Sequence, residues 1–116
     1  MSDDLASVAA VLDDEYARTI LEAARDEPRS ADELSEACDA SPSTVYRRIE
    51  RLEATGLLAD RQRIDPDGHH HKVYVSRLTR VTVDLGEDGF ACTVERDRDP
   101  DEDAVDRFTR LYEGFK

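Results

Sequence analysis

The sequence has only two cysteines, no tryptophan and no apolar run near the roughly 20 residues that cross a bilayer. Cys38 and Cys92 lie far apart, and neither has another cysteine or a histidine at metal-ligand spacing. This pattern argues against a structural zinc site and against a disulfide framework. We expect both thiols to be small core residues, with a redox-sensing pair as the alternative.

Signals for export and for catalysis are also missing. The first four residues lack the basic segment of a signal peptide, which predicts a cytoplasmic protein with no membrane partner. The sequence contains no phosphate-binding glycine loop, no neighbouring cysteine and histidine, and no nucleophile motif. We therefore expect no enzyme activity, no cofactor and no metal site.

Basic residues are scarce, and the net charge is −12. The charge is uneven, because residues 1–40 carry −9 and residues 78–116 carry −5, whereas residues 41–77 carry +2. Fourteen of the sixteen basic residues are arginine, and most acids are aspartate. This bias is typical of salt-loving archaea, in which an acidic surface serves solubility in molar salt. The apolar residues are periodic, which argues against a disordered acidic chain.

Local signals in the first half of the chain predict four helices. Leu5, Val8, Ala9 and Leu12 have helical spacing, and a second apolar stripe runs from Tyr16 to Ala24. Ser30 and Glu33 form a capping-box pattern before a short helix that ends near Cys38, with Leu34, Ala37 and Cys38 facing inward. Ser41 and Pro42 start the fourth helix, which buries Val45, Ile49 and Leu52 and ends at Gly56.

Two hairpins and a last helix are expected to follow. Strands at residues 58–64 and 72–76 flank the turn sequence Asp65-Pro66-Asp67-Gly68, and a hairpin directly after a helix-turn-helix is a wing. A second hairpin alternates apolar and polar residues around residues 86–89, and one of its faces must be buried. The predicted fold is α+β, a winged helix-turn-helix with a three-helix core over residues 1–78, followed by the second hairpin and a C-terminal helix over residues 79–116.

The C-terminal helix has a longer aromatic stripe than so small a core can bury. We therefore predict a two-fold homodimer built on the terminal helices, with the second hairpin as a further element. The alternative is that the last helix caps this hairpin within one chain. The residues predicted to form the dimer surface are Leu5, Val8, Leu12, Val105, Phe108, Leu111, Tyr112 and Phe115.

The fourth helix carries the candidate DNA contacts. Its exposed face presents Ser43, Thr44, Tyr46 and Arg47 toward base edges, because the N-terminal part of a helix in the major groove approaches the bases. Ser41, Arg48 and Arg51 are better placed for phosphates. The alternative is that these arginines pair with nearby acids, and Arg47 with Glu50 is the pair at a facing spacing.

The predicted wing supplies the remaining candidates, which are Arg61, Arg63, His69, His70, His71 and Lys72. They are expected to approach phosphates or the minor groove, with an ordinary polar wing tip as the alternative. Successive residues on a strand point to opposite faces, so the three histidines cannot converge on one metal ion.

The segments at residues 31–34, 41–49 and 52–58 resemble the ArsR-like winged-helix regulators, especially their haloarchaeal branch. The resemblance covers roughly residues 13–77, and it implies a homodimer that binds operator DNA through the helix after Ser41. The metal-sensing relatives carry a cysteine pair in the helix-turn-helix, whereas this chain has only Cys38 there, so metal sensing is not implied.

We therefore predict a sequence-specific transcriptional regulator that binds double-stranded DNA. The net charge of −12 also suggests an alternative function, in which the protein is an adaptor that docks on the transcription machinery and does not read bases. The sequence identifies no small-molecule effector.

Overall fold

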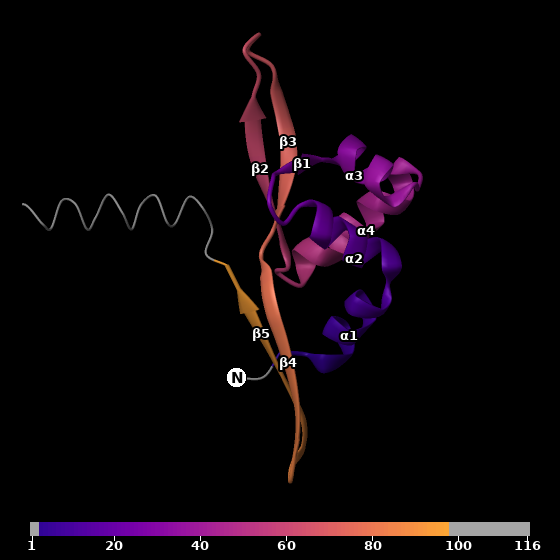
Figure 1. Cartoon of the computed structure of the whole chain (residues 1–116), viewed down its shortest axis with the longest axis vertical. Coiled ribbons are helices and arrows are strands. Elements are labelled where there is room, and N and C mark those ends of the chain that lie inside the picture. The colour runs from indigo at the N-terminus through magenta and orange to yellow at the C-terminus, as the bar shows by residue number, and fades with distance from the viewer. Residues whose placement is uncertain (1–2, 98–116) are drawn as a thin grey trace, which may run out of the picture.

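The computed structural model describes residues 3–97 of the 116-residue chain. Four helices precede two hairpins (Figure 1). The helices are α1 (Leu5–Asp13), α2 (Glu15–Ala23), α3 (Ala31–Cys38) and α4 (Pro42–Ala54). The strands are β1 (Arg29–Ser30), β2 (Leu58–Ile64), β3 (His70–Ser76), β4 (Leu78–Gly86) and β5 (Gly89–Arg96).

The helix boundaries follow from local capping. Asp14 separates α1 from α2, and its side chain accepts hydrogen bonds from the backbone N–H groups of Tyr16 and Ala17. The predicted capping box is present at α3, where Ser30 accepts from the amide of Glu33 and the Glu33 carboxylate accepts from the amide of Ser30. Asp39 then adopts the left-handed conformation, with φ of 49°, and this turns the chain into α4.

The helix α4 is capped at both ends as predicted. The Ser41 hydroxyl accepts from the amide of Thr44, and Pro42 occupies the first turn, where its missing N–H costs nothing. At the other end Gly56 has φ of +75°, which sends the chain into β2. Val45, Ile49 and Leu52 are buried on one side of the helix, so its opposite side faces outward.

The wing is the hairpin β2–β3, in which Leu58 pairs with Ser76 and Ile64 pairs with His70. The short strand β1 adds to the outer edge of β3 and gives the sheet order β1-β3-β2. This strand was not predicted, because a two-residue strand leaves no periodic signal. It ties the start of α3 to the wing.

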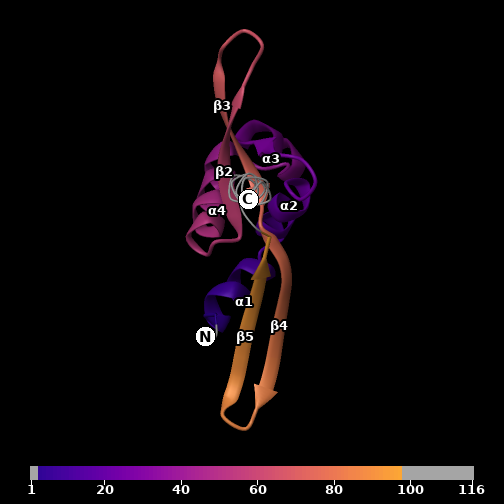
Figure 2. The same ribbon diagram turned by 90° about the vertical axis from the view of Figure 1, so that its left-hand side faces the viewer.

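The second hairpin, β4–β5, extends in the opposite direction from the wing, and the helices lie along one side of the two hairpins (Figures 1 and 2). Near its base Cys92 and Val94 are buried in the same core as the helices. The core therefore continues across the predicted division between residues 78 and 79. The expected burial of one hairpin face is found within the chain only near the base, and the half nearer the turn is exposed.

Two further corrections concern helix faces. Val8 is buried in the core of its own chain, and Leu5 and Leu12 pack partly against that core, because α1 lies against β5. Val8 is therefore not available as a dimer-surface residue. Ala37 was expected to face inward but is exposed, whereas Leu34 of the same helix is fully buried.

The α+β fold is confirmed as a helix-turn-helix, α3–α4, followed by a β-hairpin wing. The predicted C-terminal helix, with Val105, Phe108, Leu111, Tyr112 and Phe115, lies outside the described residues. Within residues 3–97, no helix is long and apolar enough to cross a membrane.

Candidate nucleic-acid interface

The outward side of α4 carries two arginines whose side chains form no ion pair or hydrogen bond within the described residues. Arg47 and Arg51 are exposed and lie one helical turn apart, so they share a face. Within residues 3–97 neither forms an ion pair or a hydrogen bond through its side chain, and the alternative pairing of Arg47 with Glu50 is not formed. Both guanidinium groups are therefore available to a ligand outside the chain.

Arg48 differs from its neighbours because it is held inside the protein. Its Nε lies 2.5 Å from a carboxylate oxygen of Asp14, and its guanidinium carbon is 5.6 Å from the centre of the Tyr16 ring. Only 27% of the Arg48 side chain is exposed. Arg48, which was predicted to contact a DNA phosphate, instead joins α4 to the start of α2.

The same contact sets the ionisation of Asp14. Partial burial raises the pKa of this carboxyl group, but the hydrogen bond and charge of Arg48 and the amides of Ala17 and Tyr16 lower it more. The net result is a pKa below the ordinary aspartate value. Asp14 is therefore ionised at neutral pH and keeps Arg48 paired.

The first turn of α4 presents a group of hydroxyls. The Ser41 Oγ lies 3.2 Å from the Ser43 Oγ and donates to the Thr44 Oγ1 over 3.0 Å. Ser41 also accepts from the Thr44 amide, so part of its hydrogen-bonding capacity is used as the helix cap. Ser41 and Ser43 are exposed, and Thr44 is half-buried.

Next to α4, one face of the wing forms the wall of a cleft of about 390 Å³. The pairs Gln62–Lys72 and Asp60–Tyr74 place these side chains on one side of the hairpin. Tyr46 of α4, His70, Lys72 and Tyr74 line the cleft together with the start of α3. Tyr46 on the outward side of α4 and this wing face therefore border the same cleft.

The cations at this cleft are partly balanced by acids. The Lys72 Nζ lies 3.3 Å from Asp60, and this hydrogen bond raises the pKa of Lys72. Burial and the neighbouring Asp60 charge raise the pKa of Glu53 on α4. Lys72 is exposed, so an incoming phosphate competes with Asp60 for it.

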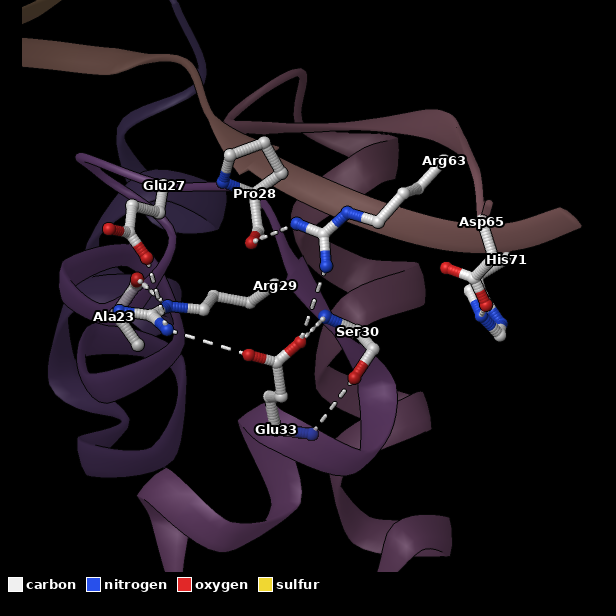
Figure 3. A network of polar contacts seen from close by, with 9 residues as sticks. All are labelled: Ala23, Glu27, Pro28, Arg29, Ser30, Glu33, Arg63, Asp65 and His71. Atoms are coloured by element: carbon white, nitrogen blue, oxygen red, sulfur yellow. Dashed lines mark hydrogen bonds and ion pairs between the residues drawn. The ribbon is translucent and has the colours of Figure 1, made fainter. Parts of the chain in front are cut away.

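The other wing face is engaged with α3 (Figure 3). Arg63 donates to the carbonyl of Pro28 over 3.2 Å and lies 4.0 Å from Glu33. Glu33 is already the capping-box residue and also lies 3.5 Å from Arg29. Arg63 is therefore directed to the back of the wing and away from the cleft.

The histidines and Arg61 also have local partners. His71 pairs with Asp65, and the Nδ1 of His69 lies 2.9 Å from Asp67, so both histidines are held by the turn. Arg61 shares the strand face of Arg63 and donates to the Asp60 carbonyl. Of the six predicted wing ligands, His70, His71 and Lys72 line the cleft with Tyr46, and of these His70 and Lys72 lie on the same strand face.

Four residues of the cleft were missed from the sequence, namely Ser30, Ala31, Asp32 and Tyr74. Tyr74 follows Lys72 by two positions, so strand alternation was a usable signal for it. Asp32 reaches the cleft from the first turn of α3, and no local pattern indicates that a wing will fold over it.

The structure also describes both thiols, which are free. Cys92 is fully buried, and burial together with the Asp14 charge raises the pKa of Cys38. A raised pKa lowers the thiolate fraction, so Cys38 is less reactive than an ordinary exposed cysteine. In residues 3–97 no group of three or more potential ligand side chains is arranged to hold a metal ion.

Residues 12–61 match the sequence model of a helix-turn-helix domain. The match starts near the end of α1 and runs into β2, so it contains the whole of α2, α3 and α4. No curated protein matches the sequence.

Proposed function

We propose that the protein, whose residues 12–61 form a helix-turn-helix domain, is a sequence-specific transcriptional regulator that binds operator DNA as a homodimer. In this proposal it acts by binding and not by catalysis, as an ArsR-like regulator of a salt-loving archaeon. One observation carries the proposal. Arg47 and Arg51 are free within the described chain and lie on the outward side of α4, the helix whose Tyr46 lines a cleft together with the wing.

The proposed binding mode places α4 in the major groove. Ser43, Thr44, Tyr46 and Arg47 then approach base edges, and Arg51 reaches a phosphate farther along the helix. Lys72 and His70 contact the adjacent backbone from the wing. Arg48 contributes indirectly, since its contact with Asp14 holds the orientation of α4.

The test is a double substitution, Arg47→Ala with Arg51→Ala. Loss of two cationic contacts should weaken binding to the native promoter at least about tenfold and reduce the salt slope by about two. Fluorescence anisotropy with promoter fragments measures both quantities. Arg80→Ala on β4 is the matched control, because Arg80 is exposed and lies on the second hairpin, away from the wing. Unchanged promoter affinity in a folded double variant would contradict the proposal.

The second candidate function is an adaptor that docks on the transcription machinery, and the net charge of −12 favours it. Chromatin immunoprecipitation separates the two. A regulator occupies discrete sites that share a motif and loses them in the double variant. An adaptor follows the distribution of RNA polymerase and does not depend on Arg47.

A further inference from the structure

One face of the second hairpin is apolar from Val81 to the turn. The register pairs Val81 with Val94, Val83 with Cys92 and Leu85 with Phe90, and directly paired residues project from the same side of a hairpin. These six side chains are uncharged and apolar, and the charged Arg96, paired with Leu78, lies beyond them at the base of the hairpin. The paired residues on the other face are polar or charged except for Ala91 and the glycine pair Gly86 and Gly89, as in Thr82 with Thr93 and Arg80 with Glu95.

Only the base of this face is covered. Cys92 and Val94 are buried in the core beside α1, whereas Val83, Leu85 and Phe90 are 48%, 72% and 65% exposed. Within residues 3–97, five large hydrophobic side chains are exposed, and three of them form this patch. The other two are Tyr46 on α4 and Ile64 on the wing, at the proposed DNA end.

Charge makes this patch the favourable place for two copies to meet. A chain of net charge −12 repels its own copies, and the repulsion is strongest where acidic surfaces face each other. The patch has no charged side chain, while Asp84, Glu87 and Asp88 lie on the other face or in the turn. An apolar patch is also self-complementary, as a two-fold interface requires.

We infer that Val83, Leu85 and Phe90 form a two-fold dimer surface and pack against the same residues of a second copy. The inference deepens the proposed function by assigning the surface through which the homodimer forms. This hairpin and the wing extend in opposite directions, so a dimer formed here leaves α4 and the wing of each copy open to DNA (Figures 1 and 2).

The competing occupant is residues 98–116 of the same chain. The described chain leaves β5 at the base of the hairpin, where the Asp97 amide donates to the Arg77 carbonyl over 2.7 Å and Arg25 pairs with Asp97. Phe90 lies at the opposite end of β5 from Asp97, the last described residue, so the described chain ends away from the exposed patch. This separation favours a second copy as the occupant.

The contact is small. Three apolar side chains per copy bury less than the 1,200 Å² or more of a stable interface, so the dimer should dissociate on dilution. Sedimentation velocity of the full chain over a range of concentrations should show a reversible monomer–dimer equilibrium. A wild-type chain that remains monomeric at every concentration would overturn the inference and indicate that the patch is covered within one chain.

Leu85→Asp in the full chain should raise the dimer dissociation constant at least about tenfold, because each copy then places a charge in the contact. Thr82→Asp is the matched control, since it adds the same charge to the opposite face of β4 and should leave the dimer intact. Leu85→Thr is a milder variant that removes apolar area without adding charge, and it should weaken the dimer in the same direction. Equal dissociation constants for Leu85→Asp and Thr82→Asp would refute the assignment.

The DNA assay keeps the two proposals separate. If only the dimer surface is wrong, Leu85→Asp keeps the wild-type promoter affinity, and the loss on Arg47→Ala with Arg51→Ala persists. If only the DNA proposal is wrong, Leu85→Asp still dissociates the dimer, although no variant changes promoter occupancy. If both are right, Leu85→Asp binds a single half-site, more weakly than the dimer binds two.

Discussion

Asp14 has two roles at the level of a single side chain. It caps α2 through the amides of Tyr16 and Ala17, and it holds Arg48 of α4 through a partly buried ion pair. The contact links the first helix of the matched domain to the proposed recognition helix. It also explains why Arg47, Arg48 and Arg51 have different roles despite their proximity in sequence.

Asp14→Ala should lower the free energy of unfolding by roughly 1–3 kcal/mol, because it removes a helix cap and leaves a partly buried arginine without its partner. Asp14→Asn should cost less, since asparagine also caps helices. Asp13→Ala is the control, because Asp13 is exposed, and its effect should stay within about 0.5 kcal/mol. Urea denaturation measures all three values. A loss for Asp14→Ala no larger than that for Asp13→Ala would contradict this role.

The same residue gives a pH dependence. The pKa of Asp14 is lower in the folded state than its ordinary value, so its charge stabilises the fold above the ordinary aspartate pKa. That contribution is lost as the pH falls through the folded-state pKa. The stability difference between wild type and Asp14→Asn should therefore be largest at neutral pH and should shrink near pH 3, as urea denaturation at the two pH values measures.

At the level of elements, the end of α4 determines where the wing begins. The Leu57 amide donates to the Leu52 carbonyl over 2.9 Å and the Gly56 amide donates to Glu53 over 3.0 Å, which together form a Schellman motif. A Cβ on Gly56 would lie 3.1 Å from the Arg96 Nε. This turn therefore joins α4, the wing and β5.

Gly56→Ala should destabilise the protein by roughly 1–2 kcal/mol, because the left-handed conformation at this position disfavours a side chain. Gly86→Ala is the matched control. Gly86 does not have a positive φ, and its added Cβ would meet only the Gly89 carbonyl at 3.9 Å. Thermal denaturation should show a clear loss for the first variant and little change for the second. Equal effects would show that the turn at Gly56 is not specifically required.

The two faces of the wing have different neighbours. Lys72 faces α4 and the cleft, whereas Arg63 faces the α3 network of Glu33 and the Pro28 carbonyl. Strand alternation predicts that these two side chains diverge. It does not predict which face meets α4, since that depends on the pairing of β1 with β3.

At the level of the whole molecule, the charge is uneven. Residues 41–77, which include α4 and the wing, are nearly balanced, whereas the rest of the chain, called the acidic body below, is strongly acidic. Residues 41–77 carry +2 and the rest of the chain carries −14. At low salt the acidic body repels both DNA and other copies of the protein. At molar salt the Debye length falls to about 3 Å, which screens this repulsion.

We expect the affinity for DNA to fall less steeply with salt than counting phosphate contacts suggests, because screening of the acidic body offsets the release of counterions. Anisotropy titrations from low to molar potassium chloride test this. The Arg47→Ala and Arg51→Ala double variant, which keeps the acidic body, is the comparison for the arginine contribution. A steep negative slope that continues into molar salt would contradict the expectation.

Local patterns in the sequence were sufficient for most of the fold. The caps at Ser30 and Ser41, the turns at Asp39 and Gly56 and the alternation of the second hairpin each depend on residues within a few positions of one another. Such short-range physics does not require knowledge of the rest of the chain. The order of elements and the outward face of α4 were therefore predictable.

The tertiary structure determined which of the residues predicted to contact DNA or a second copy are already paired or buried within the chain. Arg48 meets Asp14 and Arg63 meets Glu33 across 34 and 30 sequence positions, and Val8 is buried because α1 lies on β5. The sequence also did not predict which half of the second hairpin is exposed. Apolar and polar residues alternate uniformly along it, and only the position of α1 determines how far along the hairpin the apolar side chains are buried. Availability to DNA or to a second copy depends on contacts between distant segments, and these form only when the chain folds.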